Sequence, residues 1–234
     1  MKHSLLCAAL FAGLLLALDS AAAIEVAIGD TTIELVAPTG YCPLDRDSWP
    51  ESQLIDFTSD GIKRQGERLA YFVDCERART WHEGGSSKNV GDLVDYQASQ
   101  SFRDQNATSA KLEELCATLR KDDDSSKGWL DIFVRAFKSA MKGRYGGAED
   151  ATLAYVVLVY EDPSCYVFSS SMLKSREQVY TVSALTILKS KLVTVHLSKR
   201  FGSMDLLKGS AEDVIKHLLT ASRETATALI AANR

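Results

Sequence analysis

The strongest constraint on the fold lies in the last third of the chain, where apolar residues recur at every second position. Such alternation places successive side chains on opposite faces of a β-strand. Four segments with this pattern follow one another, at residues 152–160, 165–173, 179–188 and 192–199. The turns between them are short, and Asp162-Pro163-Ser164 is the clearest, because proline suits a turn position of fixed φ. The pattern predicts an antiparallel four-stranded meander.

The last of these segments predicts a sheet with one solvated face. Its apolar side chains are Val193, Val195 and Leu197. Its polar side chains alternate with them and are Thr194, His196 and Ser198. We expect the apolar row to meet the core and the polar row to face water, which leaves that face of the sheet available to a partner.

Apolar residues spaced by three and four predict helices before and after the meander. The clearest spans residues 126–142, where seven positions from Trp129 to Met141 fall on one stripe. A second stripe includes Cys116, so we expect this cysteine to face inward. The other helices are expected near residues 50–65, 92–103, 109–120 and 211–231.

The first part of the chain predicts further strands. Residues 25–28 and 32–37 flank a Gly29-Asp30 turn and are expected to form a hairpin. Residues 69–75 are apolar on both faces, which indicates an interior strand, whereas the polar residues 76–91 indicate an exposed loop. The predicted fold is α+β: an antiparallel sheet of N-terminal hairpin, one middle strand and C-terminal four-stranded meander, packed against helices.

The chain begins with the features of a secretory signal peptide. Lys2 gives a positive start, Leu5–Leu18 is an apolar stretch of 14 residues, and a run of three alanines ends at Ala23. The stretch is shorter than the roughly 20 residues of a membrane-spanning helix. We expect cleavage after residue 23, a single α+β domain over residues 24–234, and a periplasmic or secreted location.

The mature chain would keep four cysteines: Cys42, Cys75, Cys116 and Cys165. An even number in an oxidising compartment predicts two disulfides. Four cysteines allow three pairings, and the sequence alone does not choose among them. We favour Cys42 with Cys75 and Cys116 with Cys165, partly because the first two flank a single loop–helix–strand unit. The spacings contain no C-x₂₋₄-C knuckle, so a zinc site is not predicted.

Charge and motifs exclude several classes of partner and cofactor. Lys and Arg number 27 against 31 Asp and Glu, a formal net charge of −4, and no basic run is present. This pattern does not favour nucleic-acid binding. The chain has neither a P-loop nor a G-x-G-x-x-G segment, so no nucleotide cofactor is predicted. We also expect no integral membrane span after processing.

Two histidine neighbourhoods are candidates for acid–base chemistry. His82 and Glu83 lie in a Trp-His-Glu-Gly-Gly segment, but the second histidine of a zincin motif is replaced by Ser86. A solvated loop is therefore the preferred interpretation there. His196 or His217 could join a serine of residues 169–171 in a triad, although no G-x-S-x-G elbow is present. His217, beside a lysine, is expected on the surface.

The remaining candidates are acidic, glycan-accepting and aromatic residues. Residues Asp122–Asp124 lack the spacing of a calcium loop, and acidity at a helix N-terminus explains them better. Asn106-Ala-Thr108 matches a glycosylation sequon. Four aromatic residues in or near loops could line a ligand groove or cap the core. They are Tyr41, Trp49, Trp81 and Tyr145.

Three short segments carry a resemblance to a known group of proteins. They are Pro38-Thr-Gly-Tyr-Cys42, Val73-Asp-Cys75 and Ala231-Ala-Asn233. In these segments the chain resembles uncharacterised exported proteins of Gram-negative bacteria. The resemblance implies that Cys42 and Cys75 are bonded, and it implies no activity or catalytic residue. The order of elements is also similar to that of the PsbP/Mog1-like α+β sandwich.

Two hypotheses of function follow. The first is a non-catalytic binding or accessory protein of the cell envelope, with a protein or small-molecule ligand of unknown identity. The second is a hydrolase-type enzyme whose site is assembled from distant residues, with His82, Glu83 and His196 as candidates. An enzyme should show a concave pocket in which a histidine or carboxylate has a perturbed pKa and a partner within hydrogen-bond reach. A binding module should show an open apolar or aromatic groove without such a pair.

Overall fold

The structure is a computed structural model and describes nine stretches of the chain. These are residues 23–48, 51–52, 55, 66–83, 92–99, 103–121, 153–172, 178–201 and 211–234. The predicted helix at 126–142 lies outside them. Of the predicted helix at 50–65, only Glu51, Ser52 and Ile55 are described, and all three are helical.

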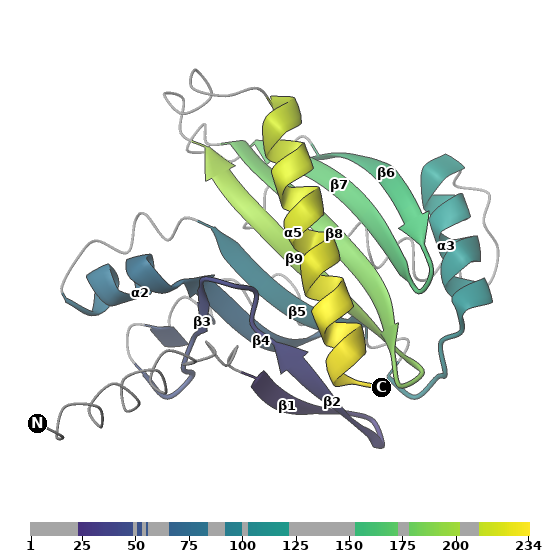
Figure 1. The fold of residues 1–234 in the computed structure, drawn as a ribbon, viewed down its shortest axis with the longest axis horizontal. Helices are drawn as coiled ribbons and strands as arrows, with labels where there is room; N and C mark the ends of the chain where they lie inside the picture. Colours follow the sequence, from purple (N-terminus) through teal and green to yellow (C-terminus); the bar gives the residue numbers. More distant parts are fainter. Residues whose placement is uncertain are drawn as a thin grey trace, which may run out of the picture.

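A seven-stranded antiparallel sheet forms the centre of the molecule, in the order β3-β4-β5-β9-β8-β7-β6 (Figure 1). Its strands are β3 (Tyr41–Pro43), β4 (Gly66–Asp74), β5 (Leu93–Ser99), β6 (Leu153–Glu161), β7 (Ser164–Met172), β8 (Gln178–Leu188) and β9 (Lys191–Phe201). The last four are the predicted meander, which is confirmed. The α+β class is confirmed as well.

Short turns fix the register of the meander. Asp162 and Pro163 alone separate β6 from β7, as the turn signal predicts. Lys189 and Ser190 connect β8 to β9 with positive φ values of 46° and 65°. Two central residues of positive φ are typical of the type I′ turn, whose twist matches that of the strands it joins.

One face of the sheet is covered by the C-terminal helix α5 (Ala211–Ala232), which crosses β8 and β9 (Figure 1). The predicted helix over 211–231 is thus confirmed. The same apolar cluster includes the hairpin of β1 (Ala23–Ile28) and β2 (Thr31–Val36). Tyr96 lies fully buried in this layer, and burial raises the pKa of its phenol far above the ordinary value.

The predicted hairpin is confirmed but forms a separate two-stranded sheet. Its turn is held by the buried Lys191, whose Nζ lies 3.2 Å from Asp30 Oδ1 and donates to the carbonyl of Arg103 at 3.1 Å. Hydrogen bonding to Lys191 holds the pKa of the Asp30 carboxyl below its usual value. The tip of the hairpin is therefore fixed to the β8–β9 end of the molecule.

Helices α2 (Cys75–His82) and α3 (Ser109–Lys121) contribute to two smaller apolar clusters. The sheet residues of these clusters have the opposite strand parity to those under α5, so both clusters lie on the other face. α3 is the predicted helix over 109–120, and its Cys116 is buried as expected.

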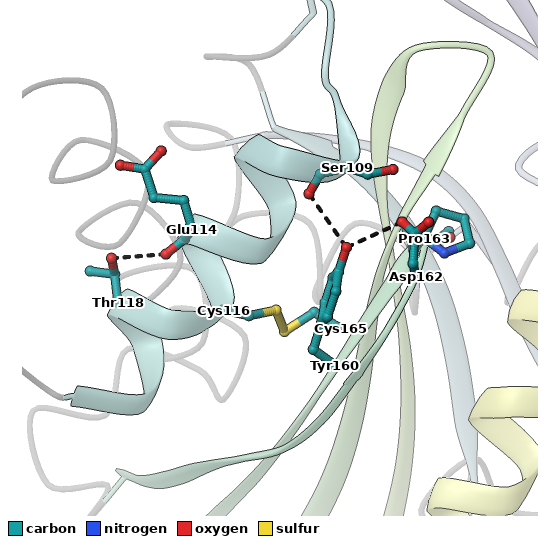
Figure 2. The surroundings of a disulfide bond; sticks show 9 residues. Ser109, Glu114, Cys116, Thr118, Tyr160, Asp162, Pro163 and Cys165 are labelled. Atoms are coloured by element: carbon teal, nitrogen blue, oxygen red, sulfur yellow. Dashed lines mark hydrogen bonds between the residues drawn. A yellow bond between two sulfur atoms is a disulfide. The ribbon is translucent and has the colours of Figure 1, made fainter.

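Both helices are linked covalently to the sheet by disulfides. Cys42 in β3 is bonded to Cys75, the first residue of α2, with their Cα atoms 4.9 Å apart. Cys116 in α3 is bonded to Cys165 in β7, with their Cα atoms 6.2 Å apart (Figure 2). This is the pairing that the sequence analysis favours.

Two predictions about the middle of the chain are wrong. Residues 93–99 form β5 rather than a helix, because this segment pairs with β4 and β9 in the middle of the sheet. Residues 75–82 form α2 rather than an exposed loop. Glu76 in the first turn of α2 and Arg79 in the last are favourable to the helix dipole, which supports a helix with little apolar surface.

Two glycines of positive φ provide a matched test of the hairpin contact. Gly29 has φ 62°, and a Cβ there would lie 2.8 Å from the carbonyl oxygen of Arg103; Gly40 has φ 82° with nothing within 4 Å. Gly40→Ala should lower the free energy of unfolding by about 1–2 kcal/mol through backbone strain alone. Gly29→Ala should lower it further, because that carbonyl also binds Lys191. Equal losses for the two variants, measured by urea denaturation of the oxidised protein, would contradict the close contact between Gly29 and Arg103.

Candidate functional site

Polar side chains gather on the sheet face opposite α5, between the apolar clusters of α2 and α3. We call this group the polar patch. Every member is at most 9% exposed. Its members are Arg68, Asp95, Gln97, Ser169, Thr181, Ser183, Thr194, His196 and Ser198. Their strands are adjacent in the sheet, so cross-strand pairing brings together residues that are distant in sequence.

The middle row of the polar patch combines a hydroxyl, an imidazole and a carboxylate. His196 in β9 is the cross-strand partner of Ser183 in β8 and of Asp95 in β5. The Oγ of Ser183 lies 2.7 Å from Nδ1 of His196, a hydrogen bond between two buried side chains. These are the residue types of a catalytic triad.

Asp95 contacts one side chain of β4 and one of its own strand. Its Oδ2 lies 3.4 Å from Nε of Arg68 and accepts a hydrogen bond from Nε2 of Gln97. The guanidinium carbon of Arg68 lies 4.0 Å from the centre of the Tyr71 ring, a cation–π contact. The carboxylate is therefore neutralised inside the protein rather than by solvent.

A second row contains hydroxyl groups only. Thr181 in β8 pairs across strands with Ser198 in β9, and their hydroxyl oxygens are 2.9 Å apart. Ser169 in β7 is the partner of Thr181 on the other side. Its Oγ is buried and has no hydrogen-bond partner within the described part of the chain.

The prediction that Thr194, His196 and Ser198 face water is wrong. All three are buried, and as side chains of the central strand they lie beside polar side chains of β5 and β8. Ser183 and Thr181 hydrogen-bond to His196 and Ser198, in place of the water that we expected there. This sheet face does not offer the predicted open polar surface.

The structure places the two predicted histidine neighbourhoods in different settings. His82 lies at the end of α2, and its Nε2 is 2.5 Å from the buried carboxylate of Glu51. Glu83 is exposed and forms an ion pair with Arg79 at 3.4 Å. α2 packs on β3 and β4, whereas His196 lies in β9, beyond β5.

Other predicted candidates are dispersed. His217 is exposed on α5, as expected, and so lies on the opposite side of the sheet from the polar patch. Asn106 of the sequon is exposed just before α3, and Tyr41 packs partly buried against the main core. The structure does not describe Trp49, residues 122–124 or Tyr145, and it describes only the backbone of Trp81.

The described stretches contain neither a metal-binding cluster nor a membrane-spanning helix. No group of three or more histidine, cysteine or acidic residues is placed to hold a metal ion. No helix in those stretches is both long and apolar enough to cross a membrane.

Sequence reasoning missed most of the polar patch. The predicted helix near residues 92–103 includes Asp95 and Gln97, and no sequence motif marks Arg68 or Ser183. A usable signal is present in β5, where Val94, Tyr96 and Ala98 alternate with Asp95 and Gln97. Period-two alternation in this segment would have predicted a strand whose second face is polar.

Comparison with known proteins assigns the chain to no family. No protein-family model matches the chain, and no curated protein matches its sequence.

The geometry of the polar patch favours a fixed hydrogen-bonded network over a reactive centre. A nucleophilic serine must be reached by its substrate, whereas Ser183 is 0% exposed. The carboxylate of Asp95 is shared with Arg68 and Gln97. Buried polar groups that satisfy one another hold neighbouring strands in one arrangement.

Removal of the charge on Asp95 should destabilise the fold strongly. Asp95→Asn keeps the shape but removes the buried carboxylate charge that lies 3.4 Å from Arg68, so we expect a loss of about 3 kcal/mol in the free energy of unfolding. The control is Glu67→Gln, which removes the exposed partner of Arg103 and should cost less than about 1 kcal/mol. Urea denaturation measures both. Similar losses for the two variants would show that the buried pair has no special role.

Proposed function

We propose that the protein is an exported, disulfide-bonded binding or accessory protein of the cell envelope without catalytic activity of its own. The observation that carries the proposal is the pair of disulfides, each of which joins a peripheral helix to the sheet. Disulfides persist in oxidising compartments such as the periplasm or the extracellular space.

The expected cleavage site is compatible with the hairpin. β1 begins at Ala23, the last residue of the predicted leader, and Ile24 pairs with Leu35 in β2. Cleavage after Ala23 would therefore remove the leader and leave nearly the whole hairpin in the mature chain.

The polar patch supports a role other than catalysis. Within the described residues it is the place where a serine, a histidine and an aspartate share one row of the sheet. Both the serine and the histidine are almost completely buried. Their burial supports a structural role for this row over a catalytic one, because a nucleophile must be reached by its substrate.

Export and oxidation are tested by fractionation and mass spectrometry of the unreduced protein. We expect the chain in the periplasm or medium, with Ile24 as its first residue and all four cysteines bonded. The control is a chain without residues 2–23, which should remain in the cytosol with reduced thiols. Recovery of the wild-type chain from cytosol with Met1 and free thiols would refute the proposal.

A hydrolase is the second candidate, favoured by the 2.7 Å contact between Ser183 and His196 and by Asp95 in the same row. A fluorophosphonate probe, which reacts with activated serines, separates the two functions. We expect no labelling of the folded protein. Labelling that Ser183→Ala abolishes and Ser169→Ala preserves would establish the hydrolase instead.

A further inference from the structure

The two edges of the N-terminal hairpin differ in how their backbone groups are satisfied. Along β2, the carbonyl of Thr32 accepts from Nζ of Lys189 at 3.1 Å, and the carbonyl of Val36 accepts from the Tyr96 hydroxyl at 2.7 Å. Between them, the side chain of Asn233 binds both backbone groups of Glu34. Side chains from three other parts of the chain therefore occupy the outer edge of β2.

The contact with Asn233 also fixes the orientation of β1. Glu34 uses its N–H and its carbonyl toward Asn233, at 2.9 and 2.8 Å, so both groups point away from β1. In an antiparallel pair, two directly opposite residues point their backbone groups either toward each other or both outward. Glu25 is opposite Glu34, so its backbone groups point outward from the other edge.

The outer edge of β1 is open within the described part of the chain. By the period of two, the outward-pointing backbone groups belong to Ala23, Glu25 and Ala27, and all three residues are exposed. Glu25 and Ala27 remain in the chain after the expected cleavage. β1 has β2 as its single neighbour in the described sheets. A strand edge of this kind is a template for pairing with another extended chain.

The charge beside this edge indicates which chain would pair with it. Glu25 and Glu34 are directly opposite on the outer face of the hairpin, and neither has an ion-pair partner among the described residues. Like charges at opposite positions destabilise a strand pair. A lysine or arginine on an added strand next to Glu25 would relieve that repulsion.

We infer that the outer edge of β1 is a docking edge for an extended segment of a partner protein with a basic residue beside Glu25. A second copy of this chain fits less well, because β1 paired with itself adds two more glutamates to the same face. The fixed hairpin tip favours docking, since a rigid edge needs little ordering on binding. The inference does not rest on export, because the edge belongs to the folded chain.

Peptide binding to the folded, oxidised protein tests this inference. The probe is a peptide of about seven residues that alternates valine and lysine, and the comparison peptide has glutamate in place of lysine. Amide NMR signals should shift in β1 with the lysine peptide, and the exchange of the Glu25 and Ala27 amide protons should slow. The glutamate peptide should bind several-fold more weakly.

Two variants separate the backbone contribution from the charge. Ala27→Pro removes an outward N–H without removing a hydrogen bond of the hairpin, and should weaken binding about three- to tenfold. Glu25→Gln should weaken binding of the lysine peptide alone, whereas Glu113→Gln on α3 makes the same charge change elsewhere and should have no effect.

Three results would overturn the inference. The first is an absence of β1 signal changes with millimolar lysine peptide. The second is unchanged binding by Ala27→Pro in a variant whose hairpin signals are intact. The third is concentration-dependent pairing of β1 without peptide, which would identify a second copy as the occupant. None of these results bears on the cellular location. The peptide-binding test can therefore fail while the export test succeeds, and the reverse.

Discussion

The pairing of β5 with β9 is the interaction on which the rest of the structure depends. Six residue pairs, from Leu93 with Ser198 to Ala98 with Val193, join strands that lie about one hundred residues apart in the chain. This pairing unites β3 and β4 with the C-terminal meander into one sheet. It also places Asp95 beside His196, and thereby creates the middle row of the polar patch.

Different chemistry on the two faces of β5 fixes the register of this pairing. Val94, Tyr96 and Ala98 face the cluster under α5, while Asp95 and Gln97 face the polar patch. A shift of the pairing register by one residue would move every side chain of β5 to the opposite face of the sheet. The carboxylate would then enter an apolar layer and lose Arg68, at a cost of several kcal/mol. The polar patch therefore specifies the arrangement of the sheet even where its net contribution to stability is small.

The difference between local and distant interactions explains what the sequence could predict. The meander, the hairpin, α3 and α5 follow from the spacing of apolar residues and from short turns, which involve neighbours in the chain. β5 was missed because its partners are distant, and the spacing of Leu93 and Tyr96 also fits a helix. The polar patch was missed for the same reason, since its residues come from five strands. The exposure of His196 was predicted wrongly because alternation shows which side chains share a face, but not what covers it.

The C-terminus shows how a side chain can close the edge of a strand. The carboxamide of Asn233 carries the same donor and acceptor as a peptide group, and it binds Glu34 as a neighbouring strand would. The same Nδ2 also lies 2.9 Å from the carbonyl of Leu229 in the last turns of α5. This couples the end of the helix to the hairpin, so loss of the C-terminal turn would open β2 as well as uncover the core. The protein itself therefore closes one edge of the hairpin, whereas within the described residues no side chain or strand closes the other.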